Sequence, residues 1–240
     1  MKPKSDIKIS IVPKKIVRFL AFTAFILVII SLSGQLIINF YDYDQHSNIV
    51  SKIAQLFDVG LENNIPTHFS ALLLFISAIL LAIIGQNEIK QQSWLVLYWR
   101  ILSLGFLFMA FDETYRIHEQ LIEPFQNLLG GENLGFLYFA WVIPYSIIVL
   151  LVGVFFYKFL FQIPSTTRNR FIIAAAFYLG GAIGVELIGG YYMEINQTRD
   201  FTYVMIQTVE ESLEIVGILI FIWALLKKVK HNIKEVRLVL

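Results

Sequence analysis

Long apolar stretches recur along the whole sequence, and short polar segments separate them. About 20 consecutive apolar residues are enough to cross a hydrocarbon core of roughly 30 Å as a helix. Six such stretches therefore predict an all-α, polytopic membrane helix bundle that forms a single domain over residues 1–240. The predicted spans are residues 16–41, 68–85, 94–122, 134–161, 171–193 and 201–226.

The segments between the spans differ in charge, and this difference predicts an orientation. Basic residues gather before the first span, in the loop after the fourth span and in the tail 227–240, whereas residues 42–66 are mainly acidic. Lys and Arg are enriched in cytoplasmic loops. We therefore expect cytoplasmic termini, an outer loop over residues 42–66 with a short amphipathic helix near 49–61, and a location in the cell membrane, which in a bacterium would be the inner membrane.

The first apolar stretch has a competing interpretation as a cleaved signal peptide. Small residues, Ser33 and Gly34, follow the apolar run 19–32 and offer a cleavage site. The apolar run continues past this site, through Leu36 to Ile38, which favours a membrane span. Either interpretation leaves the later topology unchanged.

The amino-acid composition limits the kinds of protein and of site that the chain can form. Hydrophobic residues make up 57% of the chain and charged residues only 15%, which excludes an ordinary soluble domain. The chain has no cysteine, so disulfides, thiolate ligands and thiol nucleophiles are excluded. Any metal must be bound by His and carboxylates. The net charge of +1 gives no support to nucleic-acid binding, and the expected surroundings are the lipid bilayer with a small molecule or ion as ligand.

Acidic residues inside or beside the apolar spans are the informative feature, because they are costly in lipid and usually functional. In the predicted topology they all fall in the outer half of the membrane or near its midplane, at about the same depth as His118. Positions three, four or seven residues apart share a helix face, so three helices each present one polar stripe. These residues are Asp112, Glu113, Glu119, Glu186, Glu210, Glu211 and Glu214.

Small residues in the fifth span favour close helix packing. Gly180, Gly181 and Gly184 would let a neighbouring helix approach, as small residues do in membrane bundles. Close approach would bring the carboxylates of different helices together.

Several carboxylates and a histidine facing one another are suited to a divalent cation, which offsets their mutual repulsion. The expected metal ligands are Asp112, His118, Glu119, Glu186, Glu210 and Glu214, with Glu113 and Glu211 as catalytic carboxylates, one of them a general base. These residue types do not distinguish Zn, Fe, Mn and Ca. The alternative is that the carboxylates pair with Arg116 and Arg199, or line a wet vestibule.

Two known metal motifs are absent. His118-Glu119 begins like the zinc motif H-E-x-x-H, but Ile122 stands in place of the second histidine. The Glu-x-x-His pattern of di-iron proteins also fails, because Tyr115 stands three residues before His118.

Three functions fit this pattern. The first is a metal-dependent enzyme acting on a lipid or other apolar substrate, in which the metal activates water, or oxygen if it is iron. The second is a cation or proton transporter that uses the same carboxylates. It is disfavoured by the absence of internal repeats and of carboxylates in the inner half. The third is a non-catalytic membrane partner or sensor.

Overall fold

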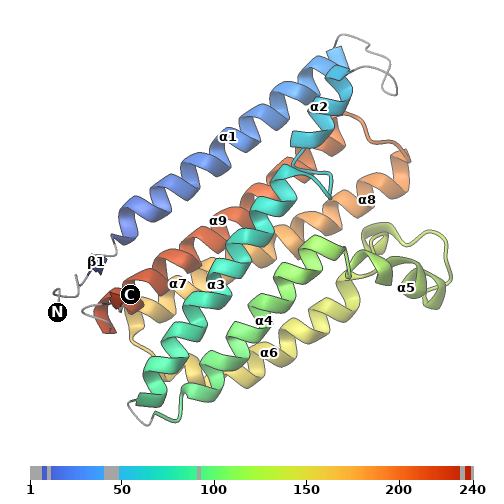
Figure 1. The fold of residues 1–240 in the computed structure, drawn as a ribbon. Coiled ribbons are helices and arrows are strands. Elements are labelled where there is room, and N and C mark those ends of the chain that lie inside the picture. The colour runs from blue at the N-terminus through green and yellow to red at the C-terminus, as the bar shows by residue number, and fades with distance from the viewer. Residues whose placement is uncertain (1–6, 10–11, 41–48, 91–92, 233–235, 239–240) are drawn as a thin grey trace.

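The structure is a computed structural model that describes residues 7–9, 12–40, 49–90, 93–232 and 236–238. Almost all of these residues are helical, and the long helices run side by side in one bundle (Figure 1). Four helical segments are long and apolar enough to cross a membrane. They confirm the all-helical class and are consistent with a membrane protein. They are α1 (Pro13–Phe40), α3 (Ile65–Lys90), α6 (Val142–Gln162) and the continuous run of α7 (Ser165–Leu179), η3 (Gly180–Val185) and α8 (Glu186–Asn196).

Two further long helices, α4 (Val96–Tyr115) and α9 (Phe201–Asn232), carry most of the acidic residues of the predicted site. Shorter elements connect the long helices. They are α2 (Ile49–Phe57), η1 (Glu119–Leu121), α5 (Ile122–Leu128) and η2 (Gly135–Leu137).

Both ends of the chain lie at the same end of the bundle. The strand β1 (Ile7–Ile9) pairs antiparallel with β2 (Val236–Leu238), with Ile7 opposite Leu238. The opposite end, here called the distal end, carries α2, α5 and the end of α8 (Figure 1). The predicted tail 227–240 begins as helix, because α9 continues to Asn232.

Two helices are shorter than the spans predicted for them. The third span was expected to reach residue 122, but α4 ends at Tyr115, because Arg116 takes a left-handed conformation (φ 55°, ψ 44°). The fourth was expected from residue 134, but residues 135–137 form a 3-10 turn and α6 begins at Val142. In both places the apolar pattern continues although the helix does not.

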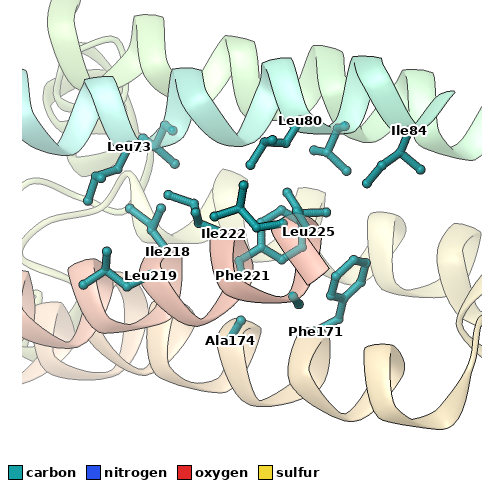
Figure 2. Close-up of a cluster of buried hydrophobic side chains, with 14 of the residues drawn as sticks. Leu73, Leu80, Ile84, Phe171, Ala174, Ile218, Leu219, Phe221, Ile222 and Leu225 are labelled. Atoms are coloured by element: carbon teal, nitrogen blue, oxygen red, sulfur yellow. The ribbon is translucent and has the colours of Figure 1, made fainter. Parts of the chain in front are cut away.

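The apolar core lies toward the end of the bundle that holds the termini. Leu73, Leu80 and Ile84 of α3 form one buried cluster with Ile218, Ile222 and Leu225 of α9, and Phe171 of α7 belongs to the same cluster (Figure 2). Helix α9 therefore lies at the centre, in contact with α1, α3 and α7.

Glycines allow α9 to lie close to the fifth helical segment. A Cβ on Gly217 would lie 2.7 Å from the Tyr178 backbone nitrogen, and one on Gly181 would lie 2.7 Å from the Glu210 carbonyl oxygen. A Cβ on Gly180 or Gly184 would meet nothing within 4 Å. Of the three glycines expected at this contact, which all lie in the π-helical turn η3, Gly181 alone makes it.

We expect Gly217→Ala to lower the free energy of unfolding by about 1–3 kcal/mol, since the new methyl group must push two backbones apart. Gly184→Ala is the matched control and should be neutral, because its methyl group enters open space. Thermal unfolding of both variants in detergent checks this. Equal melting temperatures would contradict the close packing.

Candidate functional site

All eight predicted site residues line one cavity of about 690 Å³. The cavity lies between α4, α6, α9 and the run from α7 to α8, and the acidic residues occupy its distal end. The structure therefore brings together residues of α4, α8, α9 and the turn after α4, which are far apart in the sequence. These residues are Asp112, Glu113, His118, Glu119, Glu186, Glu210, Glu211 and Glu214.

The turn after α4 is organised around the buried side chain of Asp112. Its Oδ1 accepts a hydrogen bond from the His118 backbone N–H at 2.8 Å and lies 3.2 Å from His118 Nδ1. Its Oδ2 accepts a hydrogen bond from the Tyr145 hydroxyl at 3.0 Å, which connects α4 to α6. The imidazole of His118 also packs against the Trp141 ring, with centroids 4.7 Å apart. Asp112 thus fixes both the turn and the orientation of His118.

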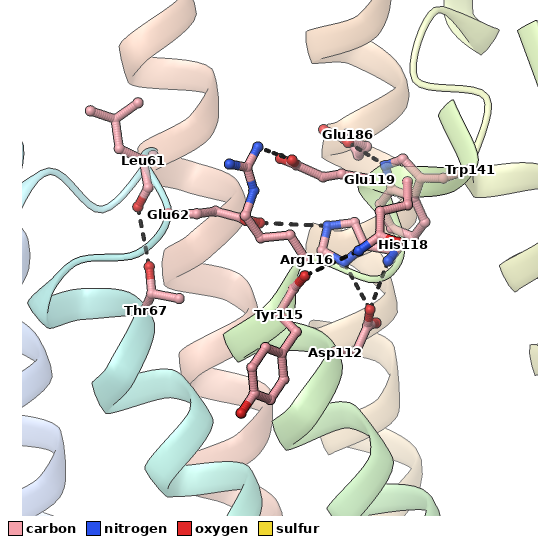
Figure 3. A network of polar contacts seen from close by, with 12 residues as sticks. Leu61, Glu62, Thr67, Asp112, Tyr115, Arg116, His118, Glu119, Trp141 and Glu186 are labelled. Atoms are coloured by element: carbon pink, nitrogen blue, oxygen red, sulfur yellow. Dashed lines mark hydrogen bonds and ion pairs between the residues drawn. The ribbon is translucent and has the colours of Figure 1, made fainter. Parts of the chain in front are cut away.

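Glu62, which the sequence analysis did not select, completes the distal end of the site. Its Oε2 lies 2.5 Å from Arg116 Nε and its Oε1 lies 3.6 Å from His118 Nε2 (Figure 3). Arg116 also forms an ion pair with Glu119. One ligand atom from each of Glu62, His118 and Glu119 lies within 4.8 Å of the others, a spacing that fits a metal ion.

The loop before α3 holds Glu62 in place through buried polar contacts. Asp58 is 1% exposed and accepts hydrogen bonds from Gln35 at 2.6 Å and Arg199 at 2.9 Å. Asn64 donates to the Asp58 carbonyl at 2.6 Å, and Thr67 donates to the carbonyl of Leu61 at 3.2 Å (Figure 3). The loop is therefore anchored to α1, to α3 and to the segment just before α9.

Glu62 and His118 lie outside the long helices, and the site shifts the pKa of both. Burial, and then the charge of Glu119, raise the pKa of the Glu62 carboxyl to about 7. Burial alone would lower the pKa of His118, but the hydrogen bond and charge of Asp112 outweigh it and raise this pKa to about 9. At neutral pH the imidazole is therefore a cation beside these carboxylates.

Deeper in the cavity, carboxyl groups meet without a basic partner. Glu186 and Glu210 lie close to each other, and Trp141 Nε1 donates a hydrogen bond to Glu186 Oε1 at 2.8 Å. Glu214 and Tyr178 line the same cavity. Carboxyl groups this close repel one another when both are ionised, and a proton or a cation between them removes the repulsion.

Arginine pairing accounts for only part of the acidic cluster. Arg116 pairs with Glu62 and Glu119, whereas Arg199 pairs with Asp58. In the part of the chain that the structure describes, no Lys or Arg forms an ion pair with the three glutamates of α9 or with Glu186. His68, in the first turn of α3, contacts the Asn64 carbonyl oxygen at 2.6 Å through Nδ1.

The rest of the cavity is apolar. Phe106 of α4 stacks on Phe221 of α9 with ring centroids 4.5 Å apart, and Phe156, Phe159 and Phe171 line the same region. Phe221 follows Glu210 by 11 residues in α9, which is roughly 16 Å at about 1.5 Å rise per residue. The cavity therefore has a polar distal end and a deep apolar end.

Sequence reasoning missed Glu62, Trp141, Tyr145 and Tyr178. The two tyrosines and the tryptophan belong to apolar spans, where aromatic residues are common and carry no distinctive signal. The available signal for Glu62 was the acidic character of residues 42–66, but it did not separate Glu62 from the other acids there.

Comparison with known proteins gives a family and no activity. Residues 14–229 match a family described as a domain of unknown function (DUF8692). No curated protein and no solved structure matches the chain.

Proposed function

We propose that the protein, which belongs to the DUF8692 family, is a membrane-embedded, metal-dependent enzyme. The family description names no activity, so the proposal is argued from the site. Its substrate is a lipid or another amphiphile whose polar part reacts at the carboxylate and histidine end of the cavity. The observation that carries this proposal is the cavity itself, which joins an acidic end to a deep apolar end.

The proposed topology has six spans, with α4 and α9 crossing the membrane beside the four apolar segments. The acidic residues of these two helices line the cavity, so they do not have to contact lipid. Lys14, Arg18, Lys227 and Lys230 lie at the end of the bundle that holds the termini. By the positive-inside rule this end is cytoplasmic, and the site then opens toward the outer face.

A divalent metal is proposed because the acidic residues exceed the positive charges near them. Eight carboxyl groups line the cavity, including that of Glu62, and His118 and Arg116 are the cationic groups beside them in the described ranges. Oxygen and imidazole ligands suit several divalent ions. The proposed ligands are Asp112, His118, Glu119, Glu186, Glu210 and Glu214, now with Glu62, and His118 would release a proton when it binds the metal.

A bound metal would act as a Lewis acid that lowers the pKa of a water molecule, or, if it is iron, it would supply oxygen chemistry. The residues of the chain would do the rest. Glu113 and Glu211 line the cavity and remain the proposed proton carriers. Asp112 keeps His118 in place, and the aromatic walls exclude water from the apolar part of the substrate.

The apolar end of the cavity favours an enzyme over a transporter. An ion path across the bundle needs polar groups along its length, as polar residues inside membranes mark ion pathways. Below the glutamates of α9, the described cavity wall consists of aliphatic and aromatic side chains such as Phe156, Phe171 and Phe221. A hydrocarbon chain fits these walls better than an ion does.

The test is to incubate metal-supplied protein in vesicles made from a total lipid extract and to follow lipid species by mass spectrometry. New species should form with wild type and with Glu123→Gln, a control in which an exposed carboxylate outside the cavity is changed. With Glu211→Gln, which removes a proton carrier, the rate should fall by about 10²-fold or more. If the lipids stay unchanged but protons or metal ions cross the vesicle membrane in a Glu211-dependent way, the protein is a transporter and the enzyme proposal is wrong. If neither activity is detected, the remaining hypothesis is a membrane sensor.

A further inference from the structure

Helix α6 contacts its neighbours mainly near its two ends. At the distal end Tyr145 donates to Asp112 of α4, and Trp141, just before α6, donates to Glu186. At the other end Tyr98 of α4 stacks on Phe159 with ring centroids 5.3 Å apart and also contacts Phe156 at 5.6 Å. These contacts lie about 11 residues apart along α6, or roughly 16 Å.

Between these two contacts the facing surfaces of α4 and α6 are separated. Gly105 is seven residues from both Tyr98 and Asp112, so it shares their helix face and points toward α6. A Cβ built on Gly105 would meet nothing within 4 Å. Gly105 also lines the cavity, so the cavity reaches the gap between the two helices at this level.

The side chains around this gap are both cavity-lining and exposed. Phe108 of α4 is 48% exposed, and Ile148 and Val152 of α6 are 52% and 45% exposed. In the proposed topology these residues lie within the membrane, where the surrounding medium is lipid hydrocarbon. The gap is therefore an apolar opening from the cavity to the bilayer.

The apolar part of the cavity has the length and walls of a binding site for one lipid chain. It extends roughly 15 Å from Asp112 to Leu102 along α4, about half of a hydrocarbon core that is roughly 30 Å thick. The whole cavity, acidic end included, has a volume of about 690 Å³, which lies within the range of roughly 300–1,000 Å³ that is usual for sites of small ligands. Aromatic and aliphatic side chains favour hydrocarbon there, because no polar group of the ligand has to be buried.

We propose that the cavity binds one hydrocarbon chain of a membrane lipid, which enters sideways from the bilayer through the opening between α4 and α6 at Gly105. The chain lies against Phe106, Phe156 and Phe221, and the polar end of the same lipid lies at the carboxylates. This last placement rests on the proposed function, whereas binding of the chain does not depend on metal.

The test is photolabelling of the full-length protein in vesicles that contain a phosphatidylcholine with a diazirine in one acyl chain. Labelled positions are mapped by peptide mass spectrometry. Wild type should be labelled at cavity-facing residues such as Phe156 and Phe221, and Gly105→Trp should reduce this labelling by about tenfold, since the indole fills the opening. Leu104→Trp is the matched control, because Leu104 is 65% exposed and does not line the cavity, and it should label like wild type.

Gly105→Leu repeats the test with a smaller obstruction in case the tryptophan variant does not fold. Labelling of wild type only at outward-facing residues such as Leu104 and Val154 would overturn the proposal that a chain is bound. Cavity labelling that both Gly105 variants leave unchanged would overturn the proposed entrance. Protein treated with chelator should be labelled as strongly as metal-supplied protein. The labelling therefore tests chain binding independently of the metal-dependent enzyme proposal.

Discussion

Replacing Glu210, Glu211 and Glu214 together by glutamine should make the metal-free protein more stable and should abolish its stabilisation by metal. The three side chains line the same end of one cavity, and no Lys or Arg within the described ranges forms an ion pair with them. Replacing buried ionic groups by uncharged residues is often neutral or stabilising by about 1–4 kcal/mol, and these partly buried glutamates repel one another, so we expect a gain within that range. A site built to bind a cation therefore costs stability when the cation is absent.

Thermal unfolding in chelator and in added divalent metal measures both effects. Wild type should gain about 2.7 kcal/mol at a metal concentration 100 times the dissociation constant, and the triple variant should gain nothing. Glu123→Gln, an exposed substitution outside the cavity, should behave like wild type in both conditions. If the triple variant is less stable than wild type in chelator, the glutamates are structural, and the metal proposal loses its main support.

Asp112→Ala should be the most damaging single substitution at the site. The buried carboxylate accepts hydrogen bonds from the His118 backbone N–H and the Tyr145 hydroxyl and contacts His118 Nδ1. Hydrogen bonds to charged groups contribute about 1.5–3 kcal/mol each, so we expect a loss of roughly 3–5 kcal/mol. The turn that ends α4 would also lose the group that holds His118 in the cavity.

Two conservative variants separate these contributions. Asp112→Asn keeps an oxygen that can accept the bond from the His118 backbone, so it should retain most of the stability while losing a charged metal ligand. Tyr145→Phe removes one bond to Asp112 and should cost about 1 kcal/mol. Unfolding in detergent measures all three variants, and an Asp112→Ala protein as stable as Tyr145→Phe would show that Asp112 does not organise the turn.

The helical class and the acidic cluster are predictable from the sequence because both follow from the cost of burying groups in lipid. Apolar stretches must be helical to satisfy their backbone hydrogen bonds. Glutamates such as Glu186 and Glu214 must turn away from lipid. These two constraints were enough to select eight residues that the structure then places around one cavity.

The helix ends and the glycine contacts, which depend on local irregularities of the backbone, were not predictable from the sequence. Arg116 ends α4 in a left-handed conformation that usually needs glycine or asparagine, and the apolar residues Ile117 and Ile122 continue the helical pattern beyond it. Gly181, in the π-helical turn Gly180–Val185, meets α9, whereas Gly180 and Gly184 do not. Neither feature has a clear sequence signal, so the predicted spans extend beyond α4 and α6, and two of the three glycines expected at the contact do not make it.

Glu62 was missed for a different reason, because its position depends on contacts that are distant in sequence. Its loop is held by Asp58, which binds Gln35 and Arg199, residues that lie 23 and 141 positions away. Contacts between residues so far apart leave no periodic pattern in the sequence from which they could be predicted. The acidic loop could be recognised as a loop, but its return to the site could not.

The most direct test of the central proposal is the metal content of the purified protein, determined by inductively coupled plasma mass spectrometry. Wild type and Glu123→Gln should each contain about one or more equivalents of a divalent metal, and the Glu210, Glu211 and Glu214 triple variant should contain less than about a tenth of that. Wild-type protein that stays free of metal even after dialysis against Zn, Fe(II), Mn and Ca would contradict the proposal, and so would equal metal in the triple variant.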